Sequence, residues 1–370
     1  MKVLYLTNVP APYRVDFFNK LGEQCELTVL FEKKTSSERD ESWKKYRFTN
    51  FTGVFLNGIS IKSDAAFCPS VIKYIRSITS DILIITNISS PTGIIAMSYC
   101  IRKTRAYYIE ADGGFPKKGK KSIKEFLKKY FISHSKGCFS TGLQLDSYFE
   151  YYGCNKTRIY RYRFSSVHET EVLKHIPTSS DRLEKRKRLE ITEKTIVSTV
   201  GQFIHRKGFD ILIKAAALVS SDIGFYIIGG KPTEEYLKYV AEYKLRNVHF
   251  VNYLEKKPLF SFLEASDFFV FPTREDIWGL VVNEAVSCGL PVISTVRCGA
   301  ALELIRDREN GFIVQVEDVV SLADKIKLFA QNPEYLEKCK LEALKTARSY
   351  TIETMAQDHL EHFRRLLESK

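Results

Sequence analysis

The sequence predicts an α/β protein made of two domains, each a parallel sheet covered by helices on both faces. The chain has 370 residues, and domains of about 150 residues make two the expected number. Short continuous apolar runs alternate with longer helical stretches, which is typical of strands buried on both faces. A polar, charged stretch at 174–194 interrupts this alternation, which then starts again. We therefore expect two doubly wound domains joined by a linker.

The first half contains five short apolar runs separated by helical or turn-rich segments. Two prolines precede the first expected helix, 13–21, and Pro91 opens a second helix that runs to Ile101. The expected strands are Val3–Leu6, Leu27–Phe31, Asp81–Thr86, Ala106–Ile109 and Gly137–Ser140. We place the first domain at 1–164 and the linker at 165–191.

The second half repeats the alternation. Its expected strands are Ile196–Val200, Phe225–Ile228, Val248–Val251, Phe268–Phe271, Pro291–Ser294 and Phe312–Val314. The expected helices lie at 209–219, 234–243, 258–265 and 279–288, with long helices from 319 to the end. We place the second domain at 192–350 and a final helix at 351–370. In doubly wound sheets the ligand crevice lies at the carboxyl ends of the strands, so the function is expected there.

Composition excludes several classes of protein. Hydrophobic residues make up 44% of the chain and charged residues 27%, which excludes disordered, collagen-like and coiled-coil chains. No apolar run approaches the roughly 20 residues of a membrane-spanning helix, and the run after Met1 is too short for a signal peptide. The eight cysteines never approach CxxC spacing, so we expect reduced thiols in a cytosolic protein.

The net positive charge of the chain lies in its first half. Lys and Arg number 56 against 44 Asp and Glu, a formal net charge of +12. Residues 1–165 hold 27 basic and 14 acidic residues, whereas residues 166–370 hold 29 and 30. Such an asymmetry concerns surface and partners rather than fold. The first domain is therefore the one expected to meet an anionic partner.

The segment after the expected strand 268–271 carries the residues best suited to chemistry. The loop from Pro272 to Trp278 contains adjacent carboxylates, and a helix opens at Gly279. Free N–H groups at a helix N-terminus favour an anion, and a carboxylate such as Glu284 can accept hydrogen bonds from two vicinal sugar hydroxyls. These features together suit a sugar diphosphate. For an isolated pair of acids, a capping loop with a solvated Glu would be the preferred interpretation.

The context of these acids resembles a known family. Asp276 and Glu284 are separated by seven residues within the run DIWGLVVNEAVSCGLPVI. This run is similar to the Glu-x7-Glu signature of retaining, nucleotide-sugar-dependent glycosyltransferases with two Rossmann-like domains, the GT-B type of glycosyl transferases group 1. The similarity extends through segments 201–212, 225–230 and 303–312, over nearly the whole second half. The first half matches only in general layout.

The resemblance implies roles for individual residues in binding a nucleotide diphosphate sugar. Glu284 would hold the nucleotide ribose, while Asp276, or Glu275 in its place, would contact hydroxyls of the transferred sugar. Arg206 and Lys207 would neutralise the diphosphate as the bond to the leaving group breaks. Other expected donor contacts are with Trp278, Gly279, Leu280 and Gly201. The family usually has Gly-Arg where this chain has Gly-Gln at 201–202, which leaves one phosphate contact unassigned.

The family also implies a cleft between the domains, an acceptor against the first domain, and a final helix that crosses back to it. Many relatives have a cleft His near the position where this chain has Glu110-Ala111-Asp112. Glu110 or Asp112 would replace that His, or the leaving diphosphate would take the acceptor proton without a protein base. These acids also resemble the metal-binding pair of single-domain glycosyltransferases. We expect no metal and no cofactor, since a cationic phosphate clamp makes a metal unnecessary.

A lysine-rich segment in the first half indicates an anionic membrane surface as a partner. Seven lysines and one acid lie between 117 and 129, followed by an apolar stripe at helical spacing over 123–131. The stripe alone would favour a helix packed on its own domain, but each basic residue near a membrane adds about 1 kcal/mol. No nucleic-acid-binding motif accompanies the lysines, so nucleic acid is not the expected partner. The residues expected to contact the membrane or the acceptor are Lys117, Lys118, Lys120 and Lys121.

These observations predict a retaining glycosyltransferase that transfers a hexose from a nucleotide diphosphate sugar to a lipid-linked glycan acceptor in cell-surface polysaccharide assembly. We expect a cytoplasmic protein attached peripherally to the inner face of the cytoplasmic membrane. A nucleotide-sugar epimerase of the same fold, and a non-catalytic nucleotide-sugar or nucleic-acid binder, are the alternatives. The sequence lacks the GxGxxG, GxxxxGK[ST], GxSxG and HExxH motifs of other enzyme classes.

Overall fold

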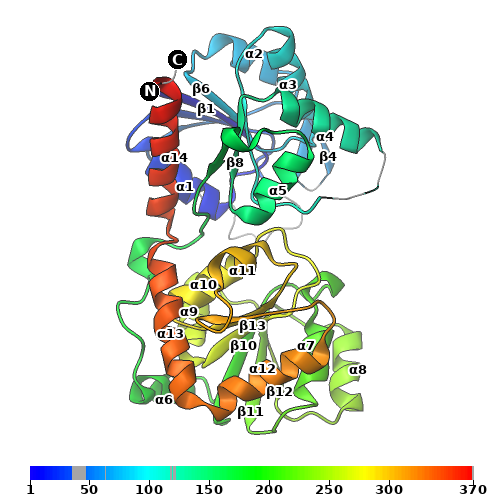
Figure 1. The fold of residues 1–370 in the computed structure, drawn as a ribbon, viewed down its shortest axis with the longest axis vertical. Helices are drawn as coiled ribbons and strands as arrows, with labels where there is room; N and C mark the ends of the chain where they lie inside the picture. The colour runs from blue at the N-terminus through cyan, green and yellow to red at the C-terminus, as the bar shows by residue number, and fades with distance from the viewer. Residues whose placement is uncertain (36–46, 63, 117–118, 120–121, 369–370) are drawn as a thin grey trace. The chain divides into compact units, whose positions relative to one another are not determined.

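The computed structural model describes residues 1–35, 47–62, 64–116, 119 and 122–368, and divides into two compact units (Figure 1). The first unit comprises Met1–Ser166 and Thr351–Lys370, and the second comprises Val167–Tyr350. Each unit has its own parallel sheet and its own hydrophobic core. The prediction of two α/β domains with parallel sheets is confirmed.

The first unit is built on a parallel sheet in the order β3-β2-β1-β6-β7-β8-β9. Its strands are β1 (Lys2–Thr7), β2 (Glu26–Phe31), β3 (Thr52–Phe55), β6 (Ile82–Ile85), β7 (Tyr108–Glu110), β8 (Gly137–Ser140) and β9 (Ile159–Arg161). A separate antiparallel pair consists of β4 (Ile59–Lys62) and β5 (Ala65–Phe67). The strand order reverses between β1 and β6, which places the crevice of this unit at the carboxyl ends of those strands.

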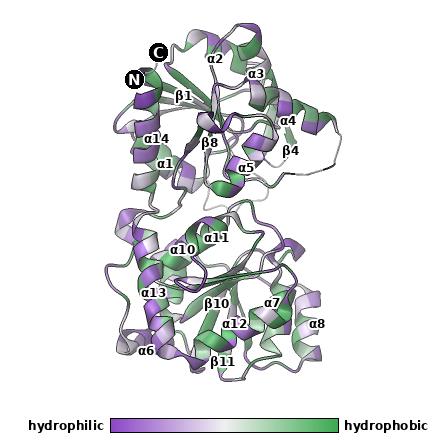
Figure 2. Ribbon diagram, viewed as in Figure 1, coloured by the Kyte–Doolittle hydropathy of each residue, from purple (hydrophilic) through white to green (hydrophobic). Residues whose placement is uncertain are grey.

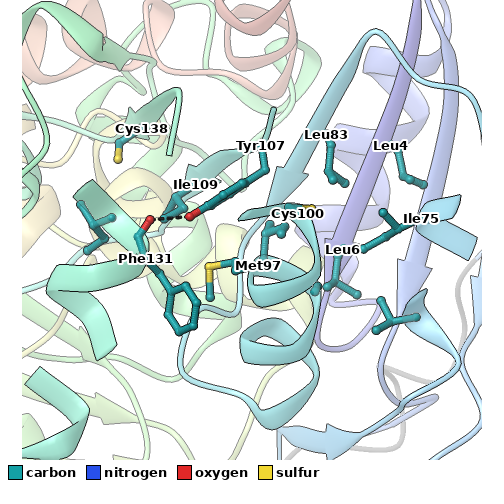
Figure 3. Packing of buried hydrophobic residues seen from close by; sticks show 14 of the residues in the cluster. Leu4, Leu6, Ile75, Leu83, Met97, Cys100, Tyr107, Ile109, Phe131 and Cys138 are labelled. Carbon is teal, nitrogen blue, oxygen red and sulfur yellow. Dashed lines mark hydrogen bonds between the residues drawn. The ribbon is translucent and has the colours of Figure 1, made fainter. Parts of the chain in front are cut away.

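Helices cover both faces of this sheet. The side chains of β1 point alternately to one face and the other, so each face has apolar residues to bury. Leu4 and Leu6 join a core with residues of α2, α3, α4 and α5, shown in Figure 3. Within that core the Tyr107 hydroxyl donates a 2.6 Å hydrogen bond to the Phe131 carbonyl. Tyr5 faces the other way and packs on aromatic rings of α1, which in turn contacts α14. The helices are α1 (Pro12–Gly22), α2 (Val71–Ser77), α3 (Pro91–Arg102), α4 (Ile123–His134), α5 (Leu143–Tyr151) and α14 (Ile352–Glu368).

The second unit is built on a parallel sheet in the order β12-β11-β10-β13-β14-β15. Its strands are β10 (Thr195–Val200), β11 (Ile223–Ile228), β12 (Val248–Val251), β13 (Phe268–Phe271), β14 (Val292–Thr295) and β15 (Gly311–Val314). Strands β11, β13 and β14 are buried along their whole length, which explains their continuous apolar sequence. Here the order reverses between β10 and β13.

Helices also surround the second sheet. α7 contacts α8 and α12, whereas α10 contacts α11 and α13. The helices are α6 (Ser179–Arg188), α7 (Phe209–Ala216), α8 (Glu234–Glu242), α9 (Lys256–Ala265), α10 (Leu280–Ser287), α11 (Gly299–Leu304), α12 (Val319–Gln331) and α13 (Pro333–Arg348). Among the described residues of both units, no helix is both long enough and apolar enough to cross a membrane.

The segment predicted as a linker, 165–191, belongs to the second unit from Val167 onward. It contains α6, which is polar along its length (Figure 2) and packs against α9. Arg186 fastens it by donating to the carbonyls of Ala265 and Lys194 at 2.8 and 3.1 Å and to the Asp267 carboxylate at 2.8 Å. A helix held by ion pairs instead of an apolar face has the polar sequence that is also typical of an exposed linker.

The final helix, α14, groups with the first unit. Asp358 accepts hydrogen bonds from the backbone and side chain of Arg163, both at 2.9 Å. The His362 ring lies 2.7 Å from the Arg161 carbonyl through Nε2. The chain therefore leaves the first unit near Ser166 and returns to it at Thr351.

Candidate functional site

The predicted donor site lies in the second unit at the carboxyl ends of β10 and β13, where the strand order reverses. Each strand runs into a loop of candidate residues, 201–207 after β10 and 272–279 after β13. The loops are hydrogen-bonded to each other, because the Arg274 N–H and the Thr273 hydroxyl both donate to the Arg206 carbonyl at 2.9 Å. Two loops that are distant in sequence thus form one surface.

The turn that carries Arg206 and Lys207 is fixed by close backbone packing. It is a short 3-10 turn, η4 (His205–Lys207), that ends at Gly208 with φ of +70°. A Cβ at Gly208 would lie 2.0 Å from the Pro272 carbonyl oxygen, so a side chain has no room there. The turn therefore lies tightly against the end of β13, and the Lys207 ammonium lies 4.8 Å from the centre of the Phe271 ring.

Arg206 and Lys207 share one carboxylate partner. Lys207 Nζ lies 2.6 Å from Asp276 Oδ2, and Arg206 Nη1 lies 3.2 Å from the same oxygen. Arg206 also donates to the Glu275 carbonyl at 2.7 Å. The structure thus brings the predicted cations and the predicted sugar-binding acid together. Asp276 compensates positive charge that would otherwise be concentrated at one point.

Glu275 and Gly201 flank this group. The Glu275 carboxylate forms an ion pair with Arg297 and is therefore directed away from Lys207. Gly201 lies beside the Lys207 side chain, whose carbons approach to 3.4 Å of the position a Cβ would take. Of the two acids proposed for the transferred sugar, Asp276 is the one that contacts the cations.

The N-terminus of α10 faces the same edge of the sheet. Gly279 precedes it with φ of +97°, and a Cβ there would lie 3.0 Å from the Cys298 sulfur. Within the described residues, the Leu280 and Val281 N–H groups have no hydrogen-bond partner, so they are available to an anion. The Trp278 indole is buried and donates to Asn283 Oδ1 at 2.8 Å. The Trp278 side chain is therefore packed within the unit, and its carbonyl accepts from the Ala300 N–H at 2.8 Å.

Glu284 lies in the second turn of α10 as a half-buried carboxylate. Its carboxylate makes no hydrogen bond or ion pair with any residue that the structure describes, although its backbone carbonyl accepts from the Ser287 hydroxyl at 2.7 Å. Burial raises its pKa to about 7, an effect that Lys256 partly offsets and Glu171 reinforces. Those two neighbours pair with each other at 2.6 Å. An unpartnered, partly desolvated acceptor is suited to binding hydroxyl groups that arrive with a ligand.

Glu110 is the fully buried centre of a polar cluster in the first unit. It accepts hydrogen bonds from the Tyr5 hydroxyl at 2.9 Å and from the Arg14 guanidinium, with which it forms an ion pair. His359 of α14 approaches it through Nε2 at 3.3 Å. Burial alone raises the pKa of Glu110, but Arg14 and His359 outweigh it and bring the value to about 2.

This placement corrects the expectation that Glu110 replaces a cleft His. The side chain has no exposed surface and a pKa far below neutrality, so it is a poor base for an acceptor hydroxyl. Its partners instead come from β1, α1 and α14, which it holds to the sheet. Asp112 keeps a 26% exposed side chain and binds Arg14 and the Tyr13 hydroxyl. Within the described residues, no three His, Cys, Asp or Glu side chains are grouped to hold a metal ion.

The lysines predicted to meet a membrane fall outside the described residues: Lys117, Lys118, Lys120 and Lys121. Helix α4 follows them, and its first half packs on the domain only in part, with Leu127 against the core. Ile123 and Phe126 are 79% and 68% exposed, whereas Phe131 and Ile132 are buried. The apolar stripe is therefore divided, with its N-terminal part facing solvent.

Sequence reasoning does not identify two residues that organise these sites. Arg274 binds Asp210 and Glu317, which are 64 and 43 residues away along the chain. His359 meets Glu110 across 249 residues. A single sequence carries no signal for such distant ion pairs, since each residue on its own has the pattern of an ordinary loop or helix residue.

Comparison with known proteins identifies relatives of the second unit. Residues 181–346 match the family model described as "Glycosyl transferases group 1". Over 167 residues the chain is 32% identical to a GDP-mannose-dependent monoacylated alpha-(1-6)-phosphatidylinositol monomannoside mannosyltransferase of Corynebacterium glutamicum, covering 42% of this chain and 43% of the relative. Other curated relatives are named as transferases of lipopolysaccharide core, capsular polysaccharide and diphospho-undecaprenol-linked glycans. The chain spans half or less of the length of the first curated relatives that it matches.

Solved structures match over the whole chain. HepE of Anabaena, crystallised with UDP, superimposes with a TM-score of 0.80 at 16% identity, covering 99% of this chain and all of HepE. Sucrose-phosphate synthase of Thermosynechococcus elongatus superimposes with a TM-score of 0.76 at 16% identity over the full length of both chains. These likenesses establish the GT-B fold.

Replacing Glu284 with Gln should weaken donor binding and stabilise the protein. The amide cannot accept two charge-assisted hydrogen bonds, so donor affinity should fall about tenfold. The pKa of Glu284 is raised from 4.5 to about 7 on folding, so ionisation in the folded state costs stability as pH rises from about 4.5 through 7. Thermal unfolding should therefore show the variant a few degrees above the wild type at pH 8 and equal to it at pH 4. Equal donor affinity in both proteins would contradict the ribose-binding role.

Replacing Glu110 with Gln should destabilise the first unit strongly. The change leaves the buried Arg14 guanidinium without one of its two carboxylates, and breaking a buried ion pair costs about 3–5 kcal/mol. Because the pKa of Glu110 is lowered to about 2, the stabilisation is present above pH 4.5 and lost as pH falls through 2. Urea unfolding at pH 7 measures the loss, with Asp112→Asn as the control. A similar cost for both variants would contradict the central place of Glu110.

Proposed function

Because residues 181–346 match the family model described as "Glycosyl transferases group 1", we propose that this GT-B chain is a retaining glycosyltransferase. It moves a hexose from a nucleotide diphosphate sugar to a lipid-linked glycan acceptor in cell-surface polysaccharide assembly. The relative from Corynebacterium glutamicum, named as acting on a phosphatidylinositol mannoside with GDP-mannose, supports this substrate class. HepE, crystallised with UDP, supports a nucleoside diphosphate in the second unit.

The observation that carries the proposal is the cation pair beside a helix N-terminus. Arg206 and Lys207 lie at the end of β10, and the unpaired N–H groups of α10 lie beyond the neighbouring strand. A diphosphate is the ligand that needs both kinds of donor at once. Glu284, farther along the same helix, adds an acceptor suited to ribose hydroxyls.

In the proposed reaction the bond between the sugar anomeric carbon and the diphosphate oxygen breaks, and the acceptor oxygen bonds to that carbon on the same face. Negative charge grows on the diphosphate as its bond breaks, and Arg206 and Lys207 stabilise it. On donor binding Lys207 exchanges part of its contact with Asp276 for the diphosphate, which leaves Asp276 able to accept sugar hydroxyls. The acceptor proton passes to the departing diphosphate, so the reaction needs no protein base. Neither the bond exchange at the anomeric carbon nor the proton transfer is assigned to a metal ion.

Product analysis separates this function from its alternatives. Donor consumption and release of free nucleoside diphosphate only when acceptor is present support a transferase. A changed donor sugar without acceptor would indicate an epimerase, and unaltered donor that stays bound would indicate a binding protein. A thermal-shift panel of UDP-, GDP- and ADP-sugars identifies the donor, since a ligand at about 100 times its Kd stabilises the protein by about 2.7 kcal/mol.

We also propose that the first unit attaches to the inner face of the cytoplasmic membrane. The first 165 residues carry the net positive charge of the chain, since 27 basic residues exceed 14 acidic ones there, and helix α4 exposes Ile123 and Phe126. Exposed apolar groups next to lysines bind anionic bilayers by combining burial with charge attraction. A lipid-linked acceptor lies at that surface, so attachment would bring the acceptor-binding unit to its substrate.

Replacing Lys207 with Ala should lower turnover more than donor affinity. The diphosphate gains charge in the transition state, so a cation aimed at it stabilises that state more than the bound donor. We expect kcat to fall at least 100-fold, the usual effect of removing one such donor, while donor affinity falls less than tenfold. Steady-state kinetics measure both, with Lys238→Ala, an exposed lysine of helix α8, as the control. Equal losses in kcat and affinity would contradict the role in the transition state.

Replacing Lys117, Lys118, Lys120 and Lys121 with Ser should abolish binding to anionic vesicles. Liposome co-sedimentation of the wild type should give binding to phosphatidylglycerol vesicles, none to phosphatidylcholine vesicles, and weaker binding as salt rises, because exposed charges are screened beyond about 8 Å.

A matched variant removes the same charge from exposed lysines of the second unit: Lys187, Lys238, Lys244 and Lys257. It should bind as the wild type does. Equal binding to both vesicle types, or equal losses in the two variants, would refute attachment through the first unit.

A further inference from the structure

Arg274 uses every one of its hydrogen-bond donors within the protein. Its side chain is 14% exposed. Nη1 and Nη2 donate to the two oxygens of Asp210 at 2.7 and 2.8 Å, and Nη1 also donates to the His205 carbonyl at 2.7 Å. Nε and Nη2 bind the two oxygens of Glu317, the latter at 3.2 Å. The five N–H groups of the guanidinium are thus all engaged, which leaves none for a ligand.

These contacts join three segments of the second unit. Asp210 lies in the first turn of α7, and Glu317 lies in the loop before α12. The third segment is the η4 turn, reached through the His205 carbonyl and through the Arg274 N–H, which donates to the Arg206 carbonyl at 2.9 Å. That turn carries the two cations that face Asp276. Arg274 therefore fixes the backbone of the turn that carries Arg206 and Lys207.

The pairing with Asp210 is strong enough to fix this geometry. Asp210 is nearly buried, with a 9% exposed side chain. Burial raises its pKa, but the hydrogen bonds and charge of Arg274, together with the charge of Lys214, lower the pKa below its usual value. Paired fork-to-carboxylate bonds are directional as well as strong, and a lysine ammonium cannot reproduce them.

We propose that Arg274 is a positioning residue for the transfer reaction: it holds Arg206 and Lys207 where they meet the donor diphosphate, without touching the substrate itself. This inference rests on the proposed function. A displacement of the cations by about 1 Å is enough to lower the rate of an otherwise intact site about 100-fold.

The test compares Arg274→Lys with a matched control, Arg186→Lys. Arg186 is similarly buried, at 13% exposed, and its side chain likewise donates to backbone carbonyls and a carboxylate, but these contacts fasten α6. Both variants should lose thermal stability to a similar degree. Arg274→Lys should also lower kcat at least tenfold with less than a threefold change in donor KM, whereas Arg186→Lys should keep kcat within twofold of the wild type.

A second readout needs no turnover. Calorimetry measures the affinity of each protein for UDP, GDP and ADP and for the matching nucleosides. The terminal phosphate of a free diphosphate carries more charge than the same group in the donor, so misplaced cations weaken its binding most. Arg274→Lys should lose at least tenfold in affinity for the diphosphate that the wild type prefers, with nucleoside affinity unchanged.

The outcomes separate this proposal from the proposed function. If the wild type binds a nucleoside diphosphate but transfers no sugar, the transferase assignment fails, while selective loss of diphosphate affinity in Arg274→Lys still supports the positioning role. Unchanged diphosphate affinity, unchanged kcat, or parallel loss in Arg186→Lys would overturn it. A wild type that binds no nucleoside diphosphate would overturn both.

Discussion

Arg206 and Lys207 are adjacent cations at the carboxyl end of a parallel sheet, where their charges repel each other. The arrangement of the second unit depends on keeping both side chains at this position. Asp276 supplies their counter-charge at 2.6 and 3.2 Å. Arg274, fixed by Asp210, anchors the turn from which they project. The glycine at 208 lets that turn approach β13 closely. The ligand site is thus a balance of charges set by backbone packing, and the surrounding α/β frame serves to keep that balance in place.

Burial has opposite outcomes for one acid of each unit, Glu110 and the half-buried Glu284. Glu110 is enclosed with Arg14 and His359, and its low pKa reflects a carboxylate whose ionised form is fully supported. Glu284 is left without a partner, and burial raises its pKa to about 7. The first arrangement stabilises the fold, whereas the second costs stability and is what a binding residue requires. The contrast separates a carboxylate that is paired within the framework from the one that we propose to bind the donor.

The sequence predicts most of the fold because buried parallel strands have continuous apolar runs; β8, β12 and β13 have the expected bounds. The edge strands β3 and β9 are not predicted, since half-exposed residues give them no apolar run. The candidate site is predicted where its residues are neighbours in sequence, as for Asp276 and Glu284. Arg274 and the burial of Glu110 depend on partners more than 40 residues away, and only the folded chain brings these together.

The salt bridge between Lys207 and Asp276 also affects which anions can enter. Asp276 is tethered to the site, so it competes with any free anion at a high effective concentration. A lone phosphate or sulfate ion offers nothing beyond the contact that it displaces. A ligand that also binds the α10 amides and Glu284 gains several contacts when it displaces the single contact between Lys207 and Asp276. In the proposed donor site, the internal carboxylate would thereby favour a larger ligand over the abundant small anions of a cell.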